Sequence, residues 1–365
     1  MLLTPAVLAA PTSAAAGSSL LPQQSIDTQA TSLWVNRTAC NNYDPEEPLA
    51  KLAADAPNVV IFGIGDSGTR GVRTLYHAGG VAMCDNTNGA DDDWATRESD
   101  NCIDHLLTAN SGKMSIESYR QAPDHAFARA VIAERYGANQ SHYCAARADH
   151  VTRAAPWGFK GPRKIYMLPV MQEAWKASKK QTQLVLVARD PRDICSGGNQ
   201  QQFKATKLHY GIRGNDATAC LEWWAAIWSN VLPELGGEAH APSASLAPSQ
   251  LVVVRIEDLV LPGVKALPLA ECMLHGASVP SPSREGLATT LHEMHKHSGS
   301  YGGGLDHVGG DAVLRANVVA AAAKSEAAQR VMELLGYTSP RYGTTTPTSD
   351  RVLRATGNKC NAINL

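Results

Sequence analysis

The chain has 365 residues, of which 44% are hydrophobic and 18% charged, and its formal net charge is -1. This is the composition of a globular protein with a sizeable core, which excludes a chain that is disordered throughout. The balanced charge excludes a protein that holds nucleic acid through a bulk excess of Lys and Arg. No stretch approaches the roughly 20 apolar residues that a membrane-spanning helix needs, so we expect no membrane segment in this sequence.

The composition changes along the chain and predicts three parts. Residues 1–57 are rich in Ala, Ser, Pro and Asn without a sustained period, and we interpret them as a leader or disordered arm. Residues 58–337 form the predicted catalytic domain, and residues 338–365 form a C-terminal tail. One α/β body around a single sheet is compatible with this length.

Several features bear on the cellular compartment. Met1–Gly17 faintly resembles a secretory leader, although it lacks a basic start, and glycosylation sequons begin at Asn36 and Asn139. The eight cysteines form an even set without C-x-x-C spacing, which is compatible with disulfides and does not support a zinc site. These features favour the secretory pathway or Golgi lumen, with the cytoplasm as the alternative.

The first predicted unit is a strand, a glycine-rich loop and a helix. Val59–Phe62 is a short apolar run, Gly63–Thr69 is the loop, and a helical pattern includes Val72. Such a loop suits phosphate, because backbone N–H groups and the helix N-terminus provide positive potential. The nucleotide-triphosphatase motif G-x-x-x-x-G-K-S/T fails, because Thr69-Arg70 stands where Lys and Ser/Thr are required.

Two further apolar runs, Leu184–Val187 and Leu251–Val254, have the continuous pattern of strands buried on both faces of a parallel sheet. Ala217–Leu235 carries an aromatic stripe at helical spacing, which predicts a core-facing helix, and Ala312–Leu335 is a second predicted helix. Glu238–Pro248 is a predicted exposed connection. The predicted fold class is α/β, a single domain whose central, mainly parallel sheet is flanked by helices and begins with a P-loop-like strand, loop and helix.

The second apolar run leads into Arg189–Ser196, which reads R-D-P-R-D-I-C-S. An arginine at the carboxyl end of a buried strand, with a hydroxyl further along the following helix, can clamp a phosphate. Ligands of open α/β sheets bind at this edge. Taken alone, however, the segment is better explained as a surface turn in which Arg and Asp pair.

The segment does not stand alone, and together with others it resembles the sulfotransferase superfamily. Gly65–Thr69 looks like that family's first loop, R/K-S-G-T, and Arg189–Ser196 looks like its second motif, R-D/N-P-R/K-x-x-x-S. Trp157–Arg163 is similar to the family's K-x-P-R segment, Arg255–Leu259 to its R-x-E-D-L strand end, and Tyr301–Tyr337 to its closing region. The matches follow one another in family order.

The resemblance implies a sulfotransferase that moves a sulfuryl group by in-line transfer to a hydroxyl or amine of an acceptor. The implied donor is 3′-phosphoadenosine 5′-phosphosulfate (PAPS), and the product is 3′-phosphoadenosine 5′-phosphate (PAP). The first loop is expected to hold the phosphosulfate, the second motif the 3′-phosphate, and a late basic, glycine-rich loop covers the nucleotide. The residues implied in donor binding are Gly65, Asp66, Ser67, Gly68, Thr69, Arg70, Arg189, Ser196, Lys296 and Gly302.

Asp66 departs from the family, which places Lys or Arg just before S-G-T. An acidic residue there repels the donor unless it points away or pairs with a base. Arg70, Arg73 and Lys160 can supply the missing charge, and Arg70 and Lys160 are candidate catalytic residues. His77, Asp85, Glu117 and His125 are the alternatives for the base that accepts the proton of the acceptor, with His77 and Glu117 as the candidate catalytic residues.

No metal is expected, because the histidines in His292–His297 do not have the H-E-x-x-H spacing. Two other functions stay open. One is a catalytically inactive nucleotide-binding homologue, for which Asp66 argues. The other is a nucleotide or small-molecule kinase with a degenerate P-loop, which lacks the loop lysine and a clear Mg²⁺-binding Asp. The acceptor is expected to be a saccharide, contacted by residues within Cys84–Asn110.

Overall fold

The computed structural model of the chain describes residues 58–83, 156–162, 165, 182–197, 200–234, 251–260, 266–277, 279, 282–296 and 312–337. No helix within these ranges is both long and apolar enough to cross a bilayer. The predicted arm and tail, the predicted connection at 238–248, both sequons, Glu117 and Gly302 lie outside the described residues.

In the described part of the chain, five parallel strands form a sheet in the order β2-β3-β1-β4-β5. The strands are β1 (Val59–Gly63), β2 (Ala82–Met83), β3 (Trp157–Lys160), β4 (Gln183–Ala188) and β5 (Leu251–Arg255). Every residue of β1 and β4 is buried, which explains their continuous rather than alternating apolar pattern. The predicted α/β class with a parallel sheet is therefore confirmed.

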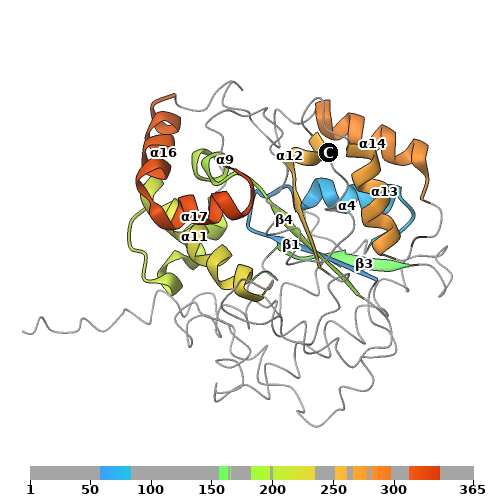
Figure 1. Ribbon diagram of the computed structural model, residues 1–365, viewed down its shortest axis with the longest axis horizontal. Coiled ribbons are helices and arrows are strands. Elements are labelled where there is room, and N and C mark those ends of the chain that lie inside the picture. Colours follow the sequence, from blue (N-terminus) through green and yellow to red (C-terminus); the bar gives the residue numbers. More distant parts are fainter. Residues whose placement is uncertain are drawn as a thin grey trace, which may run out of the picture.

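Helices cover both faces of the sheet. They are α4 (Thr69–Ala78), α9 (Pro191–Ser196), α10 (Gln201–Thr206), the 3₁₀ helix η2 (Lys207–Tyr210), α11 (Ala217–Glu234), α12 (Glu257–Val260), α13 (Ala266–Gly276), α14 (Arg284–Lys296), α16 (Ala312–Lys324) and α17 (Glu326–Leu334). Figure 1 shows α4, α13 and α14 on one side of the strands and α9, α11, α16 and α17 on the other.

Alternating side chains divide the core between the two faces. Val59 and Ile61 of β1 belong to the cluster under α4, whereas Val60 and Phe62 belong to the cluster under α11. The tryptophans of α11 are almost completely buried in the second cluster; they are Trp223, Trp224 and Trp228. The aromatic stripe therefore packs in the core, as its helical spacing predicted.

The chain leaves the neighbouring strands β1 and β4 on opposite sides of the sheet. After β1 it continues into α4 on one face, and after β4 it continues into α9 and α11 on the other. In open α/β sheets, ligands bind outside the carboxyl ends of two strands whose connections diverge in this way. The residues after Gly63 and Ala188 lie at this position.

Two features of the fold differ from the expectation. The predicted helix Ala312–Leu335 is broken at Ser325, whose Oγ accepts a hydrogen bond from the Ala328 amide at 3.3 Å and caps α17. Strands β2 and β3 were not predicted, because both are short and β3 contains Gly158 and Lys160. Residues Gly158–Lys160 of β3 nevertheless pair with Val59–Ile61 of β1, and β3 extends the sheet.

Candidate functional site

The loop between β1 and α4 lies close against the ends of two other strands. A Cβ on Gly63 would lie 2.5 Å from Ser67 Oγ and 2.6 Å from the carbonyl oxygen of Val187. Gly68 has a φ of 88°, and a Cβ there would lie 2.6 Å from Cγ1 of Ile256. Glycine is therefore required at both positions, by close approach at the first and by close approach and a left-handed backbone at the second.

This loop ends at the uncapped N-terminus of α4. Gly68 offers no side-chain acceptor as the N-cap residue, and the first turn contains no acidic residue. The first N–H groups of a helix lack intrahelical acceptors and carry partial positive charge. Ser67 is 1% exposed beside them, and its Oγ has no hydrogen-bond partner among the described residues. Because an unsatisfied buried hydroxyl costs about 1–3 kcal/mol, an anionic oxygen bound here would be favoured.

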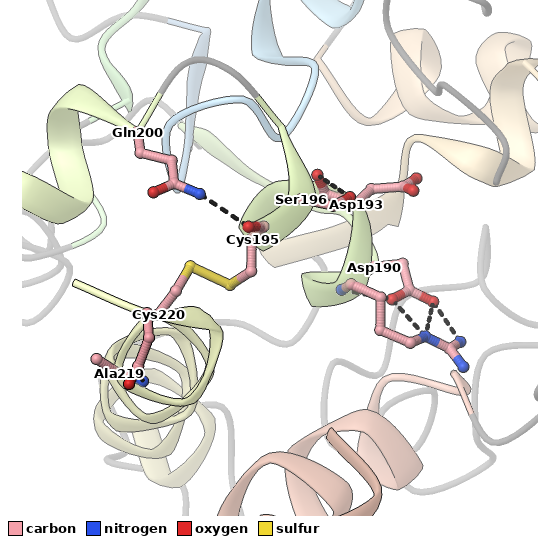
Figure 2. Close-up of a disulfide and its surroundings, with 9 residues drawn as sticks. Asp190, Asp193, Cys195, Ser196, Gln200, Ala219 and Cys220 are labelled. Atoms are coloured by element: carbon pink, nitrogen blue, oxygen red, sulfur yellow. Dashed lines mark hydrogen bonds and ion pairs between the residues drawn. A yellow bond between two sulfur atoms is a disulfide. The ribbon is translucent and has the colours of Figure 1, made fainter. Parts of the chain in front are cut away.

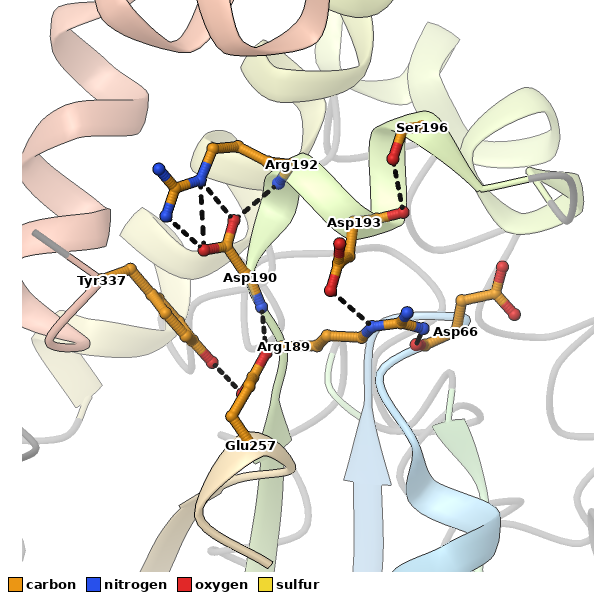
Figure 3. A network of polar contacts seen from close by, with 8 residues as sticks. All are labelled: Asp66, Arg189, Asp190, Arg192, Asp193, Ser196, Glu257 and Tyr337. Atoms are coloured by element: carbon orange, nitrogen blue, oxygen red, sulfur yellow. Dashed lines mark hydrogen bonds and ion pairs between the residues drawn. The ribbon is translucent and has the colours of Figure 1, made fainter. Parts of the chain in front are cut away.

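Asp66 joins this loop to the exit of β4. Its φ of 65° is the one positive value among the described non-glycine residues. Its carbonyl oxygen accepts a hydrogen bond from Arg189 Nη1 at 2.7 Å. Its carboxylate extends toward the end of α9, where a Cβ on Gly197 would lie 3.8 Å from Oδ2. The acidic group that replaces the expected base thus points away from Arg189 (Figure 3).

Arg189 connects the two segments that were predicted to bind opposite ends of the donor. Its side chain is 11% exposed, and its Nε lies 3.6 Å from Asp193 Oδ2. This Nε makes no hydrogen bond among the described residues. Ser196 follows on α9, half-buried, and its Oγ donates to the carbonyl oxygen of Asp193 at 3.4 Å. The structure therefore brings Gly65–Thr69, Arg189 and Ser196 to one end of the sheet.

The second arginine of the R-D-P-R segment is engaged within its own turn. Asp190 caps α9 by accepting from the Arg192 amide at 2.8 Å, and Pro191 occupies the first helical position. The Arg192 guanidinium pairs with the same carboxylate, with 2.5 Å between Nη2 and Oδ2. Both side chains are buried. This pair fixes the direction in which the chain leaves β4, and with it the position of Arg189.

Glu257, at the start of α12, binds the turn at Asp190 that joins β4 to α9. One carboxyl oxygen accepts from the Asp190 amide at 2.9 Å, and the other accepts from the Tyr337 hydroxyl at 3.1 Å. Burial is the largest cause that raises the pKa of Glu257, to about 7, and the negative charges of Asp190 and Asp193 act in the same direction. Figure 3 shows this network of contacts around the β4 exit.

Arg255 docks the closing segment of the chain against the end of β5. Its guanidinium forms an ion pair with Asp258, with 2.5 Å between Nη2 and Oδ1, and donates to the carbonyl oxygen of Gly336 at 2.9 Å. It also lies 5.6 Å from the ring centre of Tyr337. Three of the family-like segments, which are distant in sequence, are therefore joined by buried polar contacts.

A disulfide anchors α9 to the helix layer. Cys195 is bonded to Cys220 of α11, 25 residues later, and both cysteines are 1% exposed (Figure 2). Gln200 Nε2 donates to the carbonyl oxygen of Cys195 at 2.8 Å. These bonds hold the end of α9 that carries Ser196. The described residues contain no free cysteine.

The remaining candidates lie at different distances from the loop. Lys160, 4% exposed, ends β3 beside Ile61 of β1, on the face covered by α4. Arg70 lies in the first turn of α4, next to the loop. His77 is exposed in the last turn, roughly 12 Å along the helix at about 1.5 Å per residue. Lys296 ends α14, where it is exposed and pairs with Glu293 at 2.7 Å.

Gln202 contacts the loop but was not predicted from the sequence. Its Oε1 accepts a hydrogen bond from the Gly65 amide, across 137 residues. The roles of Glu257 and Tyr337 as individual residues were also missed, although both lie in segments that resemble the sulfotransferase family. For Gln202 no local signal was available, because glutamine on a short helix has no period or motif that points to a distant loop.

Among the described residues, no group of three or more His, Cys, Asp or Glu side chains is placed to hold a metal ion. A scan of the chain against protein-family models finds no match, and a search of curated protein sequences finds none either.

Proposed function

We propose that the chain is a PAPS-dependent sulfotransferase. In this proposal residues 58–337 form one domain, β1, its loop and α4 are a P-loop-like unit, and the donor lies across the ends of β1 and β4. The phosphosulfate contacts residues Gly65–Arg70, and the 3′-phosphate contacts Arg189 and Ser196. Lys296 and Gly302 belong to the segment that covers the nucleotide.

One observation carries the proposal: buried donors without hydrogen-bond partners lie beside an uncapped helix N-terminus. Ser67 Oγ and Arg189 Nε both lack a hydrogen-bond partner among the described residues, although Arg189 Nε also lies 3.6 Å from Asp193 Oδ2 as an ion pair. A phosphorylated ligand offers oxygens to both and accepts from the first N–H groups of α4.

The proposed transfer requires little covalent chemistry from the protein. The acceptor oxygen or nitrogen forms a bond to sulfur, the bond from sulfur to the bridging phosphate oxygen breaks, and PAP leaves with that oxygen. The proton of the acceptor passes to a base. His77 lies at the far end of α4, and the other candidates are Asp85, Glu117 and His125. Lys160 and Arg70 neutralise charge on the sulfuryl group and the leaving phosphate.

Asp66 favours a second candidate function, a nucleotide-binding homologue without transfer activity. A carboxylate in place of the expected lysine or arginine removes charge where it develops in the transition state.

The acceptor and the compartment belong to the same proposal. The Cys195–Cys220 disulfide supports an oxidising compartment, since such bonds persist mainly in secreted and lumenal proteins. In the secretory pathway or Golgi lumen, a saccharide is the proposed acceptor.

Calorimetric titration with PAP, followed by transfer of labelled sulfate from PAPS to an acceptor panel that includes saccharides, tests the proposal. PAP binding together with transfer supports the sulfotransferase. PAP binding without transfer supports the inactive homologue. Binding of Mg²⁺-ATP without binding of PAP overturns both and supports the kinase alternative.

A further inference from the structure

Two side chains from the segment after β4 hold consecutive residues of the first loop. Gln202 accepts a hydrogen bond from the Gly65 amide, and Arg189 donates to the Asp66 carbonyl oxygen at 2.7 Å. The peptide that links Gly65 to Asp66 is therefore flanked by both contacts. Asp66 has the left-handed φ of 65°, a conformation that Asp adopts more readily than most non-glycine residues.

The backbone of Gln202 is itself held by the core. Its carbonyl oxygen accepts from Thr206 Oγ1 at 2.8 Å, and Thr206 Oγ1 accepts from Trp223 Nε1 at 2.8 Å. The next residue, Phe203, is 1% exposed and lies 5.5 Å from Trp223, measured between ring centres. Trp223 belongs to α11, so the position of Gln202 is set by the helix layer that packs on the sheet.

We propose that Gln202 is a positioning residue for the donor, which rests on the function proposed above. Its carboxamide oxygen fixes the Ile64–Gly65 peptide, which carries the Gly65 N–H. The Ser67 hydroxyl and the N-terminus of α4 are then held in the orientation that receives the phosphosulfate. Gln202 contacts the loop rather than the reacting atoms, so it acts through the geometry of the loop.

The absence of charge on the Gln202 side chain is part of this role. The neighbourhood already contains the carboxylates of Asp66 and Asp193, and the donor brings several negative charges of its own. A glutamate at position 202 would keep an acceptor for the Gly65 amide while it placed a further negative charge against the phosphates. Geometry and charge can therefore be separated by two substitutions of the same side chain.

The experiment measures the Kd of PAP for the full chain and for Gln202→Ala, Gln202→Glu and Gln329→Ala. Gln329 on α17 is the matched control, because it is an exposed glutamine outside the proposed site whose side-chain amide also hydrogen-bonds to a backbone group, the carbonyl oxygen of Ala323. We expect about a tenfold weaker Kd for Gln202→Ala, since a factor of ten corresponds to one lost bond of ordinary strength. Gln202→Glu should bind more weakly still, with a defect that shrinks as salt is added. Gln329→Ala should bind PAP as the unmodified chain does.

A second measurement follows the loop without any ligand. Amide hydrogen exchange at Gly65 should become faster in Gln202→Ala and stay slow in Gln202→Glu and Gln329→Ala. If PAP binds the unmodified chain and Gln202→Glu with equal affinity, the inference is overturned while the proposed function stands. Unchanged exchange at Gly65 in Gln202→Ala overturns it as well. If the unmodified chain does not bind PAP, the proposed function fails, and this inference fails with it.

Discussion

Glu257 is a buried carboxyl group whose protonation changes when the chain folds. Its pKa rises from 4.5 to about 7 because burial disfavours the charged form. Below pH 4.5 the side chain is protonated in both states and contributes no pH dependence. Between 4.5 and about 7 the folded state keeps a proton that the unfolded state has lost, so stability falls as pH rises. Above about pH 7 the side chain is charged in both states, and stability no longer falls with pH because of Glu257.

Replacing Glu257 with Gln should remove this loss. The amide retains an acceptor for the Asp190 amide and a polar partner for the Tyr337 hydroxyl, but it does not titrate. We subtract the free energy of unfolding of the unmodified protein from that of Glu257→Gln. This difference should be larger at pH 8 than at pH 4.5. The gain should be on the order of 3 kcal/mol, at about 1.4 kcal/mol per pKa unit. Urea unfolding at the two pH values measures it, and a difference that stays constant between them would contradict the assignment.

Lys160 is a buried basic side chain at the end of β3, and with Arg70 it is proposed to supply the charge that Asp66 does not. Lys160→Met keeps most of the buried volume, so it should leave the affinity for PAP unchanged while kcat falls by about 10²–10³-fold. Lys160→Arg should restore part of kcat. The exposed Lys204 on α10 provides the matched control, because Lys204→Met removes the same charge away from the sheet. Full transfer activity in Lys160→Met would eliminate this role.

The sequence predicted some of the site residues because their backbone positions leave a local signal. The glycine spacing and the strand that ends before Arg189 indicate where a loop and a strand exit lie. No such signal exists for Gln202, whose contact with Gly65 depends on how two segments 137 residues apart meet. Arg192 is the opposite case. It lies in a motif that suggests ligand binding, but its side chain pairs with Asp190 in the same turn.

Helix α9 is a short element that depends on contacts outside itself. Asp190 caps its start, and the disulfide ties Cys195 near its end to α11. A helix of this length is not stable alone, since helix nucleation is costly and short helices gain little from propagation. The position of Ser196 therefore follows from these two anchors.

Removing the Cys195–Cys220 disulfide should destabilise the protein by about 3 kcal/mol, the loop-entropy value for a closed loop of roughly this size. The double variant Cys195→Ala, Cys220→Ala should also bind PAP more weakly, because Ser196 loses an anchor. Urea unfolding measures the first effect and calorimetry the second. Gln200→Ala, which removes a hydrogen bond to Cys195 but keeps the disulfide, is the control. Unchanged affinity for PAP in the double variant would show that α9 keeps its position without the bond.

The predictability of the elements follows from their length and environment. β1, β4 and β5 were predicted because burial on both faces requires uninterrupted apolar residues. β3 has four residues, of which Gly158 and Lys160 carry no strand signal, and it forms because its backbone completes pairing with β1. The break between α16 and α17 was missed because Ala-rich sequence continues through it, and the Ser325 cap is a weak signal inside a helical pattern.

At the scale of the whole molecule, the site joins the two helix layers. The first loop leads into α4 on one face of the sheet, and Arg189 leads into α9 and α11 on the other. A ligand that contacts both segments therefore bridges elements whose hydrophobic clusters are separate. Binding restricted to the folded protein adds to global stability by mass action.

PAP should stabilise the folded protein, and Arg189 should carry most of that effect. At a ligand concentration of about 100 Kd, the expected gain is about 2.7 kcal/mol. In Arg189→Gln the loss of a charged donor, worth about 1.5–3 kcal/mol, should reduce the gain at the same concentration to about 1 kcal/mol or less. Urea unfolding with and without PAP measures both gains, and each variant's own unliganded stability is its reference. Adenosine, which has no phosphate, should stabilise neither protein. Equal stabilisation of the two by PAP would remove Arg189 from the site, because a ligand held across the sheet must lose affinity when one side of its contact is neutralised.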